Sequence, residues 1–415
     1  MNNIKSKLKF IDPKQIKYKY PLLEKGLSKA DLQKGINVLK TGFITMGNHT
    51  EMFEREFANR VKSKYALMVN SGSSANLLAT FASCNPLRKN KFKRGDHALI
   101  PALCWSTSLW PLVQSGLKIK FVDIDAKTLN INADYLISKI TKNTKVIMLI
   151  NVLGISTDVK KIVNYAKKKK IIVIEDNCEA LGAKLDQKYL GTMGDFGTYS
   201  FFYSHQITSG EGGMVVCNNK QDYEILLALR SHGWSRGRKI YQKNAKKYPN
   251  LDPRYIFINS GFNLRPTDIQ AAIGRNQFKR LDFFKKTRTI NKHKIISNLI
   301  KDRRWKGQFS FVEYSKRIEP SYMVLPILLN IKFQKKKKKF IKLIEEKGLE
   351  TRPIISGSFV NQPSTKLYNL NPNNKKFNGA QKVQDLGFVI GLSTKKIDKK
   401  KLDFITNVLF LIDSV

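Results

Sequence analysis

Short apolar runs alternate with amphipathic stretches over the first half of the chain. The runs that we expect to form strands are residues 65–69, 98–100, 119–122, 146–150 and 171–174. Apolar residues at helical spacing fall between them, as in residues 75–83 and 159–168. Strands that alternate with helices in this way predict a mostly parallel sheet with helices on both faces. Ligands bind such sheets at the carboxyl ends of the strands, so the residues there are the candidates for chemistry.

Two amphipathic segments precede the first of these strands. Residues 27–39 have helical spacing, and Ser28 is the expected N-cap. Residues 51–61 repeat the pattern, with Thr50 as the expected N-cap. Serine and threonine suit this position because their hydroxyl oxygens accept a hydrogen bond from a free N–H of the first helical turn. We expect both helices to pack on the sheet.

The character of the chain changes near Arg280. Residues 283–299 predict a long basic helix, and shorter strand and helix patterns follow it. We therefore expect an α/β protein in three parts. The parts are an N-terminal arm (1–25) over the surface of the main domain, a large domain (26–282) and a smaller C-terminal α+β domain (283–415).

The chain is strongly basic, with 75 Lys and Arg against 32 Asp and Glu and a formal net charge of +43. A charge of this size makes nucleic-acid binding an alternative to be weighed. The cations gather in lysine runs such as residues 167–170 and 335–339, without the interleaved aromatic residues of a base-stacking surface. We therefore expect no nucleic-acid partner, and the reason for the charge stays open.

Composition also bears on location and on metal chemistry. No apolar run approaches the ~18 residues that a membrane span needs, and the first 20 residues lack the apolar segment of a signal peptide. We therefore expect a cytoplasmic protein with no membrane partner. The four cysteines are scattered without C-x-x-C spacing, so we expect no disulfide framework, no metal site and no iron–sulfur cluster.

Three segments that follow predicted strands carry candidate binding residues. Gly72, Ser73 and Ser74 open a helix and either present backbone N–H groups to a phosphate or only cap the helix. Trp105 offers an indole on which a flat ring could stack, or it fills the edge of the core. Asp176 supplies a carboxylate to a buried cation or protonated ring nitrogen, or it is one of several acids at a helix N-terminus. Together they indicate a site for a planar, protonated, phosphorylated ring.

A loop of unusually low charge places His205 between two predicted strands. An aromatic run at residues 199–203 precedes the loop, and an apolar run at residues 214–217 follows it. Neither Lys nor Arg occurs between Lys188 and Lys220, in a chain otherwise rich in both. The loop presents His205 for acid–base chemistry, or it is a buried hairpin that tolerates no charge.

Several of these segments resemble, in order and spacing, motifs of one known enzyme group. The chain is similar to the pyridoxal-phosphate sugar aminotransferases of the DegT/DnrJ family from about Tyr20 to its C-terminus. The motifs that carry this similarity are residues 71–76, 121–125, 175–177, 210–213 and 261–268.

The resemblance implies the type I, aspartate-aminotransferase-like fold and a pyridoxal 5′-phosphate or pyridoxamine 5′-phosphate cofactor. It implies that the turn of Gly72, Ser73 and Ser74, together with Ser200, holds the cofactor phosphate. It also implies a role for four further residues. Trp105 would stack on the ring, Asp176 would pair with the pyridinium nitrogen, Glu179 would lie near the ring hydroxyl, and Asn263 would reach the phosphate bound by a partner subunit.

The position of Asn263 implies a homodimer with shared active sites. By the same resemblance His232 lies near the cofactor, although a surface histidine at a helix end is an open alternative. Arg236 could bind the carboxylate of glutamate or a phosphate of a sugar nucleotide, or it is a solvated arginine in a basic segment. No metal ligand is expected.

One departure from the family decides the predicted activity. The aminotransferases attach the cofactor to a lysine at the place where this chain has His205. Histidine cannot make that attachment, but with a pKa near ~6.5 it can take up and return a proton. This substitution resembles the sugar 3-dehydratases of the family, and residues 105–107, 203–205 and 232–236 look most like the GDP-4-keto-6-deoxymannose 3-dehydratase branch.

The predicted reaction is therefore loss of the 3-hydroxyl from a nucleotide-linked 4-keto-6-deoxy sugar, in the synthesis of deoxysugars for lipopolysaccharide or O-antigen. Glutamate is the expected amino donor. A nucleotide-sugar aminotransferase of the same family is the alternative. The iron–sulfur dehydratases of the group need a cysteine cluster within residues 236–253, and this segment contains no cysteine. The sequence leaves the nucleotide and the sugar stereochemistry open.

Overall fold

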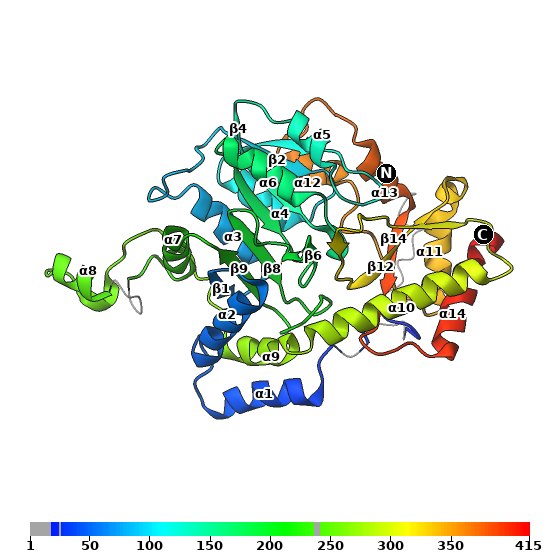
Figure 1. Ribbon diagram of the computed structural model, residues 1–415, viewed down its shortest axis with the longest axis horizontal. Helices are drawn as coiled ribbons and strands as arrows, with labels where there is room; N and C mark the ends of the chain where they lie inside the picture. The colour runs from blue at the N-terminus through cyan, green and yellow to red at the C-terminus, as the bar shows by residue number, and fades with distance from the viewer. Residues whose placement is uncertain (1–17, 25, 236–240) are drawn as a thin grey trace, which may run out of the picture.

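The computed structural model of the protein describes residues 18–24, 26–235 and 241–415 (Figure 1). The helices are α1 (Lys29–Lys40), α2 (Asn48–Val61), α3 (Gly72–Ser83), α4 (Ser106–Gln114), α5 (Ala133–Ser138), α6 (Val159–Lys168), α7 (Lys220–Arg230), α8 (Tyr241–Lys247), α9 (Asp268–Phe278), α10 (Leu281–Lys301), α11 (Lys337–Glu346), α12 (Pro363–Leu367), α13 (Asn378–Leu386) and α14 (Lys399–Leu409). The strands are β1 (Tyr65–Val69), β2 (His97–Pro101), β3 (Lys118–Val122), β4 (Thr144–Ile150), β5 (Ile172–Asp176), β6 (Lys184–Leu185), β7 (Lys188–Tyr189), β8 (Phe196–Ser200), β9 (Gly213–Cys217), β10 (Phe309–Phe311), β11 (Ile318–Glu319), β12 (Val324–Leu329), β13 (Thr351–Arg352) and β14 (Gly387–Gly391).

A seven-stranded sheet forms the centre of the larger part of the molecule. Its strand order is β1-β9-β8-β5-β4-β2-β3. The five strands from β8 to β3 are parallel, whereas β9 runs antiparallel to both β1 and β8. Because β8 and β9 are antiparallel hydrogen-bonded neighbours, the loop between them lies at the carboxyl end of β8. The five strands expected from the apolar runs are all present, with ends shifted by at most two residues.

Two boundaries near the site differ from the sequence prediction. The helix expected at residues 75–83 begins at Gly72, so the small-residue turn is the first turn of α3. The aromatic strand expected at residues 199–203 is β8, which begins at Phe196 and ends at Ser200.

The two helix starts near the N-terminus show one correct and one wrong N-cap prediction. Ser28 caps α1, and its side chain and that of Asp31 form a reciprocal capping box. Thr50 does not cap α2, because α2 begins at Asn48 with Gly47 as its N-cap. The free N–H groups there have a partner that is distant in the sequence, since the carboxylate of Asp268 accepts hydrogen bonds from Gly47 N and Thr50 N at 3.0 and 2.8 Å. A remote carboxylate replaces the local cap that the sequence pattern indicated.

An aromatic cluster supports the base of the loop that carries His205. Phe53 and Phe57 of α2 pack with Phe201, and Phe278 of α9 stacks on Phe57 with ring centroids 5.1 Å apart. Tyr199 of β8 completes the cluster edge-on to Phe57. All five rings are buried. The residues just before the loop are therefore fixed by dense packing, which makes the end of β8 a rigid mount.

A second, four-stranded antiparallel sheet lies beyond the large one, in the order β10-β12-β14-β13. The long helix α10 runs from beside α9 toward α14, past this smaller sheet (Figure 1). The described part of the N-terminal arm belongs here as well. Tyr20 pairs with Leu349, and its hydroxyl donates to Gly391 O at 3.1 Å. The expectation that the arm covers the main domain is therefore wrong for residues 18–24.

The exact limits of the expected arm, large domain and small domain remain predictions.

The helix α8 lies far out from the main body of the molecule (Figure 1). In the part of the chain that the structure describes, no helix combines the length and the apolar character required to cross a membrane.

Candidate active site

The first turn of α3 and the end of β8 form one side of the candidate site. Ser71 is the N-cap of α3, and its hydroxyl oxygen accepts a hydrogen bond from Ser74 N at 3.0 Å. A Cβ atom on Gly72 would lie 2.5 Å from Cβ of Ser200, so only glycine allows the helix to begin this close to the strand. The structure thus brings together Gly72, Ser74 and Ser200, three residues predicted from distant segments. N–H groups of a first helical turn have no partner within the helix and favour an anion.

The serine hydroxyls of this turn are tied to neighbouring segments. Ser74 Oγ donates to Asn70 Oδ1 at 2.5 Å, and Ser73 Oγ shares a hydrogen bond of 2.8 Å with Thr107 Oγ1 of α4. The second bond joins the start of α3 to the start of α4, where Trp105 is the N-cap residue. Trp105 is 57% exposed, so its indole is accessible to a flat ring that stacks on it.

Asp176 is the last residue of β5, whereas the sequence prediction placed it in the segment that follows the strand. It is buried, and its Oδ2 accepts hydrogen bonds of 2.7 Å from both Asn76 Nδ2 and Ser108 Oγ. Its Oδ1 accepts a third bond from Cys178 N at 3.0 Å. No Lys or Arg side chain in the described part of the chain forms an ion pair with it. A buried carboxylate held in one orientation without a cation suits a positively charged ligand atom.

The two glutamates beside Asp176 have different environments. Glu175 is fully buried and accepts hydrogen bonds from the N–H groups of Gly191, Met193 and Gly194, so it fixes a turn of the main chain. Glu179 accepts one bond from Leu153 N at 3.1 Å. Burial raises the pKa of Glu179 to about 7, and the nearby Asp176 carboxylate adds to the effect. Glu179 can therefore hold or release a proton near neutral pH.

His205 lies in the loop between β8 and β9, as predicted, and it is half-buried. Its Nδ1 is buried and has no hydrogen-bond partner in the described part of the molecule. Burial lowers the pKa of His205 to about 4, against smaller opposing effects of the Ser200 main chain and the Asp176 carboxylate. The imidazole is therefore neutral at pH 7 and can accept a proton. This environment is compatible with a catalytic His205, and that role remains a prediction.

His232 and Asn263 lie in a separate cluster. Ser231 pairs with Asn263 as an isolated β-bridge, and Arg265 contacts both predicted residues, with Nε donating to Asn263 Oδ1 at 3.1 Å and NH2 lying 3.3 Å from His232 Nε2. Across the described residues, no hydrogen bond links this cluster to Asp176 or His205. Asn263 is exposed, as a residue that serves a partner subunit would be. Arg236 lies outside the described residues.

Three features of this structure fit a pyridoxal-type cofactor. The first turn of α3 provides a phosphate cradle that a Cβ on Gly72 would fill. Asp176 is a buried acceptor without a cation, suited to a protonated ring nitrogen. Trp105 leaves a face of its indole open beside them. The assignment of each residue to a part of the cofactor remains a prediction.

Four residues that organise this site were not predicted in these roles. Asn76 and Ser108 orient Asp176, Arg288 binds the main chain around His205, and Gln206 ties the His205 loop to main-chain carbonyl groups of other segments. Asn76 and Ser108 sit in uncharged helix starts, where a polar residue facing the sheet was a usable signal. Gln206 and Arg288 gave no such signal, because their partners are main-chain carbonyl groups of distant segments.

Comparison with known proteins places the chain in a family. The family model described as the DegT/DnrJ/EryC1/StrS aminotransferase family matches residues 26–405. The chain is 36% identical over 354 residues to a GDP-4-keto-6-deoxy-D-mannose 3-dehydratase of Yersinia pseudotuberculosis, covering 84% of this chain and 87% of the relative. It is 32% identical over 317 residues to a GDP-perosamine synthase of Escherichia coli O157:H7, covering 76% and 78%.

A solved structure agrees with these relatives. An E. coli GDP-4-keto-6-deoxy-D-mannose 3-dehydratase with bound hydrated pyridoxal phosphate superimposes with a TM-score of 0.83 at 31% identity, over 94% of this chain and 99% of that one. The fold is accordingly the type I, aspartate-aminotransferase-like fold that the sequence predicts. The chain belongs to the DegT/DnrJ/EryC1/StrS aminotransferase family.

Proposed function

We propose that this chain is a pyridoxal-phosphate-dependent 3-dehydratase of GDP-4-keto-6-deoxymannose or a related nucleotide-linked 4-keto-6-deoxy sugar. The observation that carries the proposal is His205 in the loop after β8, neutral and half-buried, in a loop without lysine. The similarity to the dehydratase of Y. pseudotuberculosis supports the same substrate class. The product would be a 3-deoxy sugar for lipopolysaccharide or O-antigen synthesis.

The residues of the site divide the work of holding the cofactor. The first turn of α3, with Gly72 and Ser74, and Ser200 of β8 would bind the phosphate. Trp105 would cover one face of the ring, and Asp176, oriented by Asn76, Ser108 and Cys178 N, would keep the ring nitrogen protonated. In its amine form the cofactor supplies a nitrogen that joins the C4 ketone of the sugar and a ring that takes up electrons when a proton leaves.

His205 would move the protons of the reaction. Its neutral imidazole would first accept a proton at a ring nitrogen, acting as general base. It would then return this proton to the 3-hydroxyl, which leaves as water. General acid–base catalysis of this kind contributes typically about 10²- to 10⁴-fold to a rate. Glu179, with a pKa of about 7, lies in the loop after β5 beside Asp176 and would exchange a proton with the ring hydroxyl.

The amino donor and the substrate would be bound by further groups of the site. Glutamate would supply the amino group, which is released as ammonia after the 3-hydroxyl has left. His232 would bind the substrate or cofactor of a partner subunit, because it sits with the exposed Asn263 outside the hydrogen-bond network of Asp176. Arg236 would bind a carboxylate of glutamate or a phosphate of the nucleotide.

A nucleotide-sugar aminotransferase is the second candidate, and the similarity to GDP-perosamine synthase favours it. The two activities differ in the fate of nitrogen. A dehydratase releases the nitrogen of glutamate as ammonia, whereas an aminotransferase leaves it on the sugar. The lack of lysine between Lys188 and Lys220 disfavours transamination.

The test is incubation of the protein with pyridoxal phosphate, glutamate and GDP-4-keto-6-deoxymannose. We expect release of ammonia, measured with an enzymatic assay, and a sugar product that has lost the 3-hydroxyl, identified by mass spectrometry. An amino sugar without ammonia release would establish the aminotransferase instead. A panel with other nucleotides and sugar isomers defines the substrate.

We also propose that the protein is a homodimer with shared active sites. Three apolar side chains at helical spacing on α1, Leu32, Ile36 and Leu39, are 48%, 42% and 54% exposed. Phe43 and Ile44 extend this apolar surface in the following loop, at 60% and 43% exposed. An apolar stripe of this kind is typical of an interface between subunits. The expected mass in solution is about twice 47.6 kDa, measured by light scattering.

A further inference from the structure

One buried guanidinium holds the main chain that carries His205. Arg288 lies on α10 and is 2% exposed. It donates to the carbonyl oxygens of His205 at 3.3 Å, Gln206 at 2.9 Å and Leu392 at 3.2 Å. Leu392 directly follows β14 of the smaller sheet. The side chain therefore joins the loop after β8, the long helix and the smaller sheet at a single point.

The hydrogen-bond partners of the Arg288 guanidinium are carbonyl groups, whereas a buried cation usually pairs with a carboxylate. None of the carboxylates in the described residues forms an ion pair with it. Burial alone lowers the pKa of its guanidinium to about 10, so the group stays charged at neutral pH. A buried charge is costly unless hydrogen bonds satisfy it, and charge-assisted bonds to three carbonyls do so. Two of these bonds hold the main chain of the His205 loop against α10.

The orientation of His205 depends on this main chain. Nδ1 of the ring has no hydrogen-bond partner in the part of the chain that is described, so no side chain holds the ring through that atom. Gln206 provides the second anchor, with Nε2 donating to Glu179 O and, at 3.0 Å, to Ser321 O. The loop is thus fixed through its peptide groups, and Arg288 supplies the anchor closest to the His205 carbonyl.

Charge gives Arg288 a second effect on His205. The titratable and charged groups around the imidazole are Asp176 at the end of β5, Cys178 and Glu179 in the loop after it, and Arg288 from α10. Burial lowers the pKa of His205 most, the Ser200 main chain and the Asp176 carboxylate raise it, and the Arg288 guanidinium lowers it further. Removal of the Arg288 charge should therefore make the imidazole easier to protonate.

We propose that Arg288 is a positioning residue for the dehydration step, because its guanidinium fixes the peptide that carries His205. The inference rests on the proposed 3-dehydratase function. Arg288 contacts neither substrate nor cofactor in this role, because all three of its bonds end on main-chain carbonyl groups.

The experiment compares Arg288→Gln, Arg288→Lys and Lys292→Met in the holoenzyme. Lys292 is the matched control, since it is a second buried cation of α10 but donates to Tyr322 Oη at 2.9 Å, and among the described residues it has no hydrogen bond to the His205 loop. We expect both Arg288 variants to lose about tenfold or more in kcat, because a displacement of about 1 Å can cost 10²-fold. KM for the nucleotide sugar should change less than about threefold, as binding groups are untouched.

The pH dependence separates positioning from general support of the fold. In Arg288→Gln the acidic limb of kcat against pH should move upward by about half a pH unit or more, whereas Arg288→Lys keeps the charge and should leave it in place. A readout independent of turnover is the titration of the His205 imidazole by NMR of histidine-labelled protein, assigned with His205→Asn among the five histidines. Its pKa should rise in Arg288→Gln alone.

The outcomes distinguish this inference from the proposed function. A wild-type protein that releases no ammonia and forms no 3-deoxy product would overturn the proposed function itself. An active wild type, with Arg288 variants that match Lys292→Met in kcat, pH profile and His205 titration, would overturn the inference alone. Failure of both Arg288 variants to give folded holoenzyme would also overturn it, because the arginine would then serve folding.

Discussion

At the scale of single residues, His205 decides which reaction the site performs. Replacement of His205 by Asn removes the base but keeps a polar side chain of similar size. We expect 3-deoxygenation to fall by about 10²-fold or more, while the absorbance of bound cofactor stays near that of the wild type. Product formation and the absorbance spectrum provide the measurement. The exposed His293→Asn on α10 is the control and should keep full activity.

The opposite substitution, His205→Lys, restores the group that the aminotransferases of the family use. We expect a covalent attachment of the cofactor to this lysine, seen as a new absorbance band and trapped by borohydride, together with some transaminase activity. An unchanged spectrum would count against an otherwise intact aminotransferase site around Asp176 and Ser200.

The same scale shows what the sequence could and could not predict. Gly72 and Asp176 were found because both lie at the ends of apolar strands, where chain order and position in the sheet are linked. Arg288 was not found, because it is 83 residues from His205 and is one of many cations in a basic helix. Its importance comes from burial and from three carbonyl partners, which no local pattern encodes.

At the scale of elements, remote carboxylates and arginines set the positions of helices. Asp123, in a motif that the family resemblance used, accepts hydrogen bonds from Gly379 N and Ala380 N at 2.9 and 3.0 Å. These are N–H groups of the first turn of α13, so Asp123 ties the large sheet to the smaller part of the molecule. As with Asp268 at α2, the cap comes from a residue far away in the chain. This is why helix existence was predictable here but N-cap identity was only partly so.

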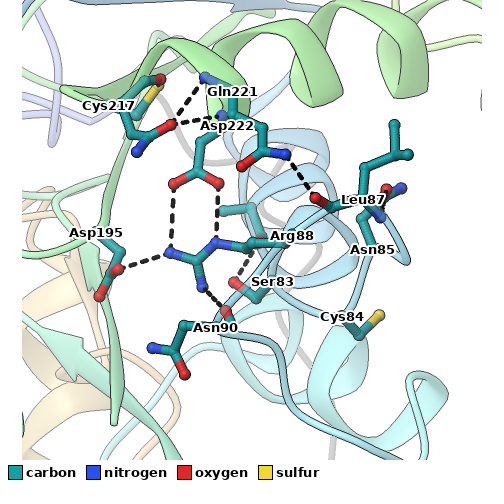
Figure 2. A network of polar contacts seen from close by, with 12 residues as sticks. Ser83, Cys84, Asn85, Leu87, Arg88, Asn90, Asp195, Cys217, Gln221 and Asp222 are labelled. Atoms are coloured by element: carbon teal, nitrogen blue, oxygen red, sulfur yellow. Dashed lines mark hydrogen bonds and ion pairs between the residues drawn. The ribbon is translucent and has the colours of Figure 1, made fainter. Parts of the chain in front are cut away.

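Arg88 joins three elements in the same way (Figure 2). Its Nε and NH2 lie 2.8 and 2.6 Å from oxygens of Asp222 in α7 and Asp195 before β8, and NH1 donates to Asn90 O. Replacement of Arg88 by Met leaves a buried Asp222 without its cation. Breaking a buried pair of this kind costs about 3–5 kcal/mol, so we expect a loss of this size in the free energy of unfolding, measured with urea.

A surface pair on α11 is the matched control for Arg88. Lys342 lies 3.9 Å from Glu346, and both side chains are about half exposed. Lys342→Met should change the free energy of unfolding by less than about 0.5 kcal/mol. Equal effects of the two substitutions would show that burial does not strengthen the Arg88 network.

At the scale of the whole molecule, the site described in one chain is incomplete if Asn263 serves a partner. The Asp176 carboxylate raises the pKa of His205, so these two groups lie close enough to interact, whereas Asn263 lies in the cluster around Arg265 and has no hydrogen bond to either group in the described part of the chain. In a shared-site dimer, a site would combine His205 of one subunit with Asn263 of the other. The residues of one subunit alone would then be insufficient for turnover.

Mixing two inactive variants tests this arrangement. His205→Asn and Asn263→Ala homodimers should each have low activity, but in a heterodimer one of the two sites would contain both defects and the other would be intact. Random exchange of equal amounts makes half of the dimers heterodimers, so about a quarter of the wild-type activity should return. A mixture of His205→Asn with Asp176→Asn, whose defects would both fall among the residues that one subunit gives to its own site, should recover nothing. Equal behaviour of the two mixtures would mean that each chain builds its site alone, because only a site divided between subunits allows the two defects to be separated.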